Sequence, residues 1–87
     1  MNKAFDYNVC KNNNPDEFIR ICKLIEQGIS SLKKEKLLVD VDGSTIQVYE
    51  KNGNEIIVYD DYDIGAVYIE ADMDLSEILN NIEISVA

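Results

Sequence analysis

The chain has 87 residues, 46% of them hydrophobic, with a net charge of −9 and no histidine. This length suits one domain, and the hydrophobic content is too high for a disordered acidic tail. The lack of histidine excludes Ser–His–Asp and Cys–His nucleophilic schemes and every histidine metal site. We therefore expect a single folded domain over residues 1–87 with one small core.

The negative charge is unevenly distributed along the sequence. Residues 1–51 contain all 8 basic residues and an equal number of acidic ones, so the whole net charge of −9 lies on residues 52–87. Nucleic acid and anionic membranes would be repelled by this segment, so we expect neither as a direct partner. A basic protein partner is the expectation that this charge favours.

Targeting signals are missing from the sequence. The first residues lack the apolar stretch of a secretory signal, and no apolar run is long enough to span a membrane. We therefore expect a cytoplasmic location, in which Cys10 and Cys22 stay reduced.

A helix is predicted from about residue 15 to residue 34. Asn14 is suited to cap it, Pro15 to its first position, and Glu17 completes a capping box. An apolar stripe with three- and four-residue spacing follows, which indicates one buried helix face. Its members are Phe18, Ile21, Cys22, Ile25, Ile29 and Leu32.

The hydrophobic spacing then changes to the alternation that is typical of strands. Turn signals at Asp42–Gly43 and Asn52–Gly53 leave connections so short that neighbouring strands must be antiparallel. We expect Ile46 and Val48 to face the core. The predicted strands are residues 37–41, 45–50, 55–60 and, after an acidic loop, 64–70.

Asp74 is suited to cap a short last helix, with Leu75, Ile78, Leu79 and Ile82 facing inward. The alternating tail, residues 83–87, is a candidate edge strand. The predicted order is an N-terminal helix, a three- to four-stranded antiparallel meander and a short C-terminal helix. This order gives an α+β fold with the helices packed on one sheet face.

Patterns for catalysis or metal binding are weak. The two cysteines do not have zinc-ligand spacing, and the glycines are isolated, so no phosphate-binding loop is present. Residues 40–44 resemble the start of a calcium loop, but the glycine comes too early, and Lys51 stands where a bidentate glutamate belongs. We expect no enzyme activity, no metal and no cofactor.

Tyrosines and carboxylates alternate along the predicted strands and their acidic loop. Tyrosine offers a rigid, half-polar contact surface, and carboxylates pair with Arg and Lys or stand in for nucleic-acid phosphates. Alternatively, tyrosine is an ordinary strand residue and the exposed acids are only solvated. The candidate partner-binding residues are Tyr59, Asp60, Asp61, Tyr62, Asp63, Tyr68, Glu70, Asp72 and Asp74.

The turn over residues 52–55, followed by Ile56-Ile57-Val58 and an acidic run, resembles the central hairpin of small acidic phage-encoded anti-CRISPR inhibitors that mimic DNA. The predicted layout of residues 15–82 is similar to that of one type within the family. The resemblance implies a stoichiometric inhibitor that occupies the groove where a nuclease reads duplex DNA. The neutral N-terminal half departs from it and would confine mimicry to one side.

Three functions fit these observations. The first is an acidic inhibitor that blocks a nucleic-acid-binding protein, in its most specific form an anti-CRISPR protein on the DNA-binding surface of a CRISPR effector. The second is an immunity protein that neutralises a basic nuclease toxin, which would present the same acidic surface. The third is a structural interaction module whose charge has no electrostatic role.

Overall fold

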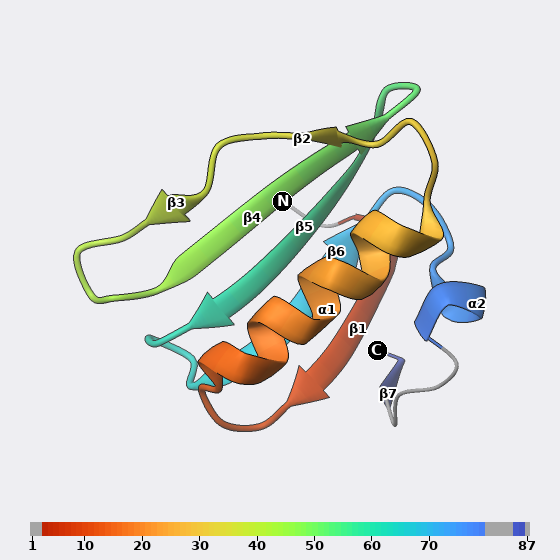
Figure 1. The fold of residues 1–87 in the computed structure, drawn as a ribbon. Helices are drawn as coiled ribbons and strands as arrows, with labels where there is room; N and C mark the ends of the chain where they lie inside the picture. The colour runs from red at the N-terminus through yellow and green to blue at the C-terminus, as the bar shows by residue number, and fades with distance from the viewer. Residues whose placement is uncertain (1–2, 80–84, 87) are drawn as a thin grey trace.

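The computed structural model describes residues 3–79 and, for the backbone alone, residues 85–86. Strands and two helices follow one another along the chain (Figure 1). They are β1 (Phe5–Cys10), α1 (Pro15–Gly28), β2 (Lys33–Lys34), β3 (Leu38–Val39), β4 (Thr45–Lys51), β5 (Asn54–Asp61), β6 (Ala66–Ala71), α2 (Ser76–Leu79) and β7 (Ser85–Val86).

The described strands form one antiparallel sheet in the order β2-β4-β5-β6-β1-β7, with β3 also paired to β4. Because β2 and β3 follow each other along the same edge of β4, the sheet is six strands wide. The first strand lies between β6 and β7, where Tyr7 is opposite Ile69 on one side and Val86 on the other. The fold is thus α+β.

Helix α1 begins as the sequence predicts. The Asn14 side chain accepts a hydrogen bond from the Glu17 N–H at 3.2 Å, and Pro15 occupies the first turn. The helix ends at Gly28, before the predicted residue 34, and the next residue, Ile29, is already extended with φ −123° and ψ 117°. Ser31 then takes a left-handed turn conformation with φ 58°. The lysines that follow pair with β4 as an edge strand instead of extending the helix. None of the described helices has the length and apolar character needed to cross a membrane.

One face of the sheet, here called the helix face, packs against α1 (Figure 1). Alternation along each strand assigns its residues to this face or to the opposite one, here called the open face. The core lies between α1 and the helix face, as predicted for helices covering one side. Its sheet residues are Tyr7, Tyr49, Ile56, Val58, Ile69 and Ala71, and those of α1 are Phe18, Ile21, Cys22 and Ile25.

The prediction that the ordered chain starts with a helix is wrong, because β1 precedes α1. Tyr7 is only 2% exposed, and its side chain links β1 to the segment just before α2. Its hydroxyl donates to Asp74 Oδ1 at 3.2 Å and accepts from the Leu75 N–H at 2.9 Å. The alternation of Phe5, Tyr7 and Val9 is a strand signal that the sequence contained.

The predicted orientation of β4 is also wrong. Gln47 and Tyr49 are buried on the helix face, whereas Ile46 and Val48 lie half-buried on the open face. The polar ends of the buried pair are satisfied. The Gln47 amide donates to Glu35 O at 2.7 Å, and the Tyr49 hydroxyl donates to the Glu26 carboxylate. Because their polar atoms are hydrogen-bonded, Gln47 and Tyr49 can be buried without a large desolvation cost. The sequence prediction assumed that cost and therefore placed the apolar Ile46 and Val48 in the core.

Both predicted turns are confirmed, with positive φ at Gly43 (93°), Asn52 (53°) and Gly53 (84°). The predicted strand over residues 37–41 is reduced to β3 at the sheet edge, and it is exposed. The short last helix is confirmed at Ser76–Leu79, but the expected inward position of Ile82 lies outside the described residues.

Asp60 is 2% exposed on the helix face, where Asp60 Oδ1 accepts from the Asn13 side-chain amide at 2.9 Å and from the Asn14 N–H at 3.4 Å. Replacing Asp60 with Ala leaves both donors without this acceptor, so we expect the free energy of unfolding to fall by about 1–3 kcal/mol. The matched control, Asp63→Ala, removes the same charge from an exposed position nearby and should change stability by at most about 0.5 kcal/mol. Urea unfolding followed by circular dichroism measures both, and equal effects would contradict the structural role of Asp60.

Candidate protein-binding face

The open face carries apolar, aromatic and acidic side chains side by side. Alternation places on it half-buried apolar residues of β4 and β5, two tyrosines of β5 and β6, and carboxylates of β4, β5, β6 and β1, with Ile57 directly opposite Glu70. The apolar residues are Ile46, Val48 and Ile57, the tyrosines are Tyr59 and Tyr68, and the acids are Asp6, Glu50, Glu55, Asp61 and Glu70.

The two tyrosines form the centre of this face. Tyr59 and Tyr68 are opposite each other on β5 and β6, and their rings stack with centroids 4.5 Å apart and planes 15° apart. Each hydroxyl donates to a carboxylate of the other strand, Tyr59 to Glu70 Oε1 at 3.0 Å and Tyr68 to Asp61 Oδ2 at 2.8 Å. Burial, together with the hydrogen bond to Glu70, raises the pKa of Tyr59 to about 12. The pair is a rigid aromatic platform between fixed carboxylates.

Asp6 and Glu70 are directly opposite each other on β1 and β6 and share the open face. Like charges in such a cross-strand pair are destabilising. In the described part of the chain, the Asp6 Oδ1 atom is buried and has no hydrogen-bond partner. None of the ion pairs formed by residues 3–79 includes Asp6, Asp61 or Glu70. This end of the face therefore holds negative charge that the described residues do not compensate.

A hollow of about 240 Å³ opens at the other end of the tyrosine platform. The β3–β4 and β5–β6 turns meet there, where the Ser44 hydroxyl accepts from the Tyr62 N–H at 2.8 Å. Its acidic lining consists of Asp40, Asp42, Asp61 and Asp63. No group of described residues has the arrangement of three or more ligands that would hold a metal ion.

Six of the nine sequence-predicted residues lie together. Tyr59, Asp61, Tyr68 and Glu70 share the open face, and Tyr62 and Asp63 lie in the adjoining turn after β5. Tyr62 is 46% exposed and is the most accessible aromatic ring of this group.

The structure places the other three predicted residues away from this group. Asp60 is buried on the helix face. Asp72 forms an ion pair with Lys3 at 3.1 Å and accepts from the Glu55 N–H. Asp74 Oδ1 accepts from the Ser76 N–H at 2.9 Å at the start of α2, and this hydrogen bond lowers the pKa of its carboxyl. These three carboxylates have structural partners within the chain.

Among the acids that sequence reasoning missed are Asp6, Asp40 and Asp42. All three belong to the neutral N-terminal half, and they join the acidic segment only because β1 lies beside β6 and the β3–β4 turn beside the β5–β6 turn. The alternation of β1 could have indicated the side of Asp6, but not that β6 would be its neighbour.

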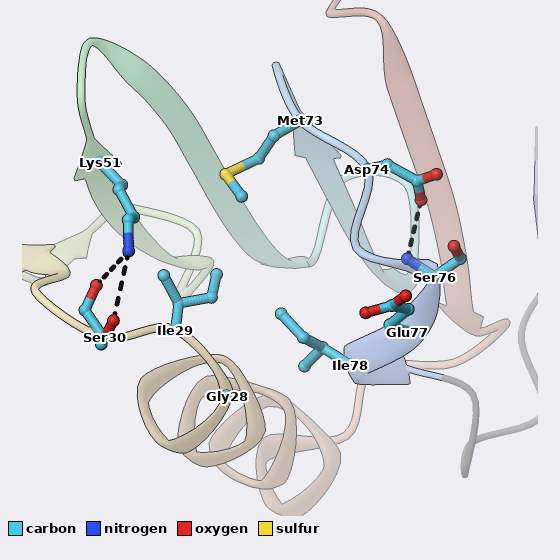
Figure 2. Close-up of a pocket in the computed structure, with 9 residues that line it drawn as sticks. All are labelled: Gly28, Ile29, Ser30, Lys51, Met73, Asp74, Ser76, Glu77 and Ile78. Carbon is cyan, nitrogen blue, oxygen red and sulfur yellow. Dashed lines mark hydrogen bonds between the residues drawn. The ribbon is translucent and has the colours of Figure 1, made fainter.

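A second hollow, of about 510 Å³, lies between the end of α1 and α2 (Figure 2). Figure 2 shows Met73, Ile29 and Ile78 pointing into it, while the Lys51 ammonium donates to the Ser30 carbonyl. Asp74 Oδ1 also accepts from the Ser76 N–H, so these polar groups of the hollow are already paired within the chain.

Comparisons of this chain with protein-family models, with curated proteins and with solved structures give no match. The candidate site therefore rests on the geometry and charge of the chain itself.

The Tyr59–Glu70 hydrogen bond can be tested by titration. Glu70→Gln removes the acceptor's charge, so we expect the pKa of Tyr59 to fall from about 12 part of the way towards 10, because burial still opposes the phenolate. The Tyr59 phenol keeps its proton to higher pH in the folded chain than in the unfolded chain. Its contribution to the free energy of unfolding is therefore complete below pH 10 and is lost as the pH rises towards 12. NMR titration of the tyrosine ring signals measures the shift, with Asp63→Asn as the control. If the pKa of Tyr59 were unchanged in Glu70→Gln, the hydrogen bond between Tyr59 and Glu70 would be contradicted.

Asp6→Asn should stabilise the isolated protein. It removes one of two opposed negative charges, and its amide can donate to Glu70, which adds roughly 0.5–1 kcal/mol to the free energy of unfolding. Thermal and urea unfolding at low salt measure the change, and added salt should reduce it. Asp63→Asn is the control for the general loss of one charge. If Asp6→Asn were no more stable than this control, the repulsion between Asp6 and Glu70 would be refuted.

Proposed function

We propose that this protein is an acidic inhibitor that binds a nucleic-acid-binding protein through its open sheet face. The observation that carries the proposal is the uncompensated pair of carboxylates, Asp6 and Glu70, beside a rigid tyrosine platform on a face that α1 leaves uncovered. Arg and Lys side chains of a partner would pair with the accessible parts of the half-buried Asp6 and Glu70 carboxylates and would relieve the repulsion.

The distribution of basic residues supports this reading. Lys3 is bound to Glu55 and Asp72 at the end of the sheet away from the β3–β4 turn, and Lys34 is bound to Glu26 on α1. The open face is therefore acidic next to apolar and aromatic surface. Tyrosine is enriched at hot spots of protein interfaces, and the carboxylates favour a partner of opposite charge. Direct binding of nucleic acid by this face is disfavoured by charge repulsion.

The most specific form of the proposal is an anti-CRISPR protein on the DNA-binding surface of a CRISPR effector. The observed layout differs from the one on which that resemblance was based, since β1 precedes the helix and the sheet is six strands wide. The acidic segment after Lys51 and the carboxylates gathered on one face are what support it now. Cytoplasmic location, a basic partner and the lack of enzyme activity belong to the same proposal.

The first test identifies the partner. The tagged protein is used as bait in cell lysate, and the proposal expects a DNA- or RNA-binding protein that both salt and competing duplex DNA release. A CRISPR effector among the captured proteins supports the anti-CRISPR form, and a nuclease toxin supports an immunity protein. A partner that neither salt nor duplex DNA releases would contradict the proposal.

The second test locates the surface with the purified partner. Reversing Asp42 and Asp63 to Lys changes two acids that line the hollow, and we expect a tenfold or greater loss of affinity and a flatter salt dependence. The matched control reverses Asp16 and Glu77, which are exposed on the two helices and change the net charge equally. Equal losses from both variants would show that only net charge matters, and no loss from either would favour a module without an electrostatic role.

A further inference from the structure

The two stacked tyrosines of the open face each have one ring face that the other does not cover. Their rings are 4.5 Å apart and nearly parallel, so the inner faces cover each other. The strand order β4-β5-β6-β1 turns the outer face of Tyr59 towards β4 and that of Tyr68 towards β1. The tyrosine platform is therefore a ridge with one aromatic surface on each flank.

A hollow lies on each flank of this ridge. The acidic hollow between the β3–β4 and β5–β6 turns, here called the Tyr59 hollow, is lined by Tyr59 and by four aspartates. On the other flank, a hollow that also measures about 240 Å³ is lined by Tyr68, Glu70 and Asp6, and it is here called the Tyr68 hollow. Each hollow thus combines a tyrosine ring with at least two carboxylates.

This combination fits the guanidinium group of arginine better than the ammonium group of lysine. Arginine is planar, stacks on aromatic rings and forms paired hydrogen bonds with carboxylates, whereas lysine carries a compact and strongly hydrated charge. The tyrosine hydroxyls donate to Asp61 and Glu70, so these carboxylates are held in place beside the rings. Within residues 3–79, no ion pair compensates Asp6, Asp61 or Glu70. Both flanks of the ridge therefore favour a cation from outside the chain.

A second copy of this chain does not suit the ridge. The sequence contains one arginine, Arg20, and its guanidinium is bound to Glu17 on α1. Each copy also has a net charge of −9, so two open faces would repel each other. The occupant that the charge favours is a different protein with basic side chains.

We propose that the partner places two arginine side chains across the tyrosine ridge, one in each hollow. This inference rests on the proposed function, because it specifies what the basic partner presents to the open face. A cation in contact with an aromatic ring lies within about 6 Å of the ring centre. Since the two rings are 4.5 Å apart, the two guanidinium groups would be roughly 10–15 Å apart. Residues i and i+7 on one face of a helix are about 10.5 Å apart and satisfy this spacing.

Designed peptides with two arginines test the spacing and the chemistry. Alanine-based helices of about 20 residues carry the arginines at i and i+7, or, in the control, at i and i+5, which point to different sides of the helix. NMR titration of the isotope-labelled protein measures both the affinity and the place of binding. We expect the i, i+7 peptide to bind about fivefold more tightly than the control and to shift the amide signals of Tyr59, Tyr68 and Glu70. Lysine in place of both arginines should weaken binding about threefold, and neutral citrulline should abolish it.

A variant that fills one hollow from within the chain tests the location. Asn8 is exposed, lines the Tyr68 hollow and is opposite Tyr68, so Asn8→Arg places a guanidinium beside this hollow. We expect it to weaken binding of the i, i+7 peptide about fivefold. The matched control, Gln27→Arg, makes the same charge change at an exposed position of α1 and should alter the affinity by at most about twofold. Asp63→Arg fills the Tyr59 hollow in the same way, with Asp16→Arg as its control.

Three outcomes overturn the inference. The first is no binding of the i, i+7 peptide up to about 5 mM, and the second is equal binding of the two spacings or of arginine and lysine. The third is a loss of affinity in Asn8→Arg and Asp63→Arg, each with a circular dichroism spectrum like that of the natural chain, that is no larger than in their controls. The proposed function is tested separately, because capture of a nucleic-acid-binding protein that salt and duplex DNA release does not depend on the spacing of arginines. Such capture without a spacing effect would refute the arginine pair alone.

Discussion

A single helix of 14 residues covers one face of a sheet six strands wide, and most of what the molecule exposes depends on this ratio. At 1.5 Å per residue the helix is about 21 Å long and has one apolar stripe, so it buries one sheet face and no more. The opposite face must keep its own side chains half in water. Its mixture of aromatic, apolar and acidic residues is the result, and this mixture is why we propose this face as the partner-binding surface.

Strand spacing determines the electrostatics of that face. Neighbouring strands are about 4.8 Å apart, which is less than the Debye length of roughly 8 Å at physiological ionic strength. Salt therefore screens charges on adjacent strands only weakly from each other. Carboxylates such as Asp6 and Glu70 on adjacent strands therefore repel each other in the free protein. If this face binds a basic partner as we propose, the repulsion that lowers stability in the free protein would be relieved in the complex, a common compromise between stability and function. The hydrogen bonds from Tyr59 and Tyr68 to Glu70 and Asp61 hold the carboxylates in place without neutralising them.

The two edges of the sheet also differ. The β1 edge is extended by β7, whereas the β4 edge has only the short pieces β2 and β3. The second piece, Leu38–Val39, is apolar and exposed, and it meets the open face near Ile46.

Local chemistry in the sequence was enough to determine the start of α1 at Asn14, the turns at Gly43 and Gly53, and the asymmetric charge, because each depends on neighbouring residues alone. Tertiary structure decided the rest. The side of β4 that is buried depends on the reach of Tyr49 to Glu26, and the burial of Asp60 depends on donors from the loop before α1. Insertion of β1 beside β6 brings residues from the two ends of the chain together, and no local pattern encodes such a non-local pairing. The sequence thus determined how much negative charge the protein carries, and the sheet topology decided which of those charges share a face.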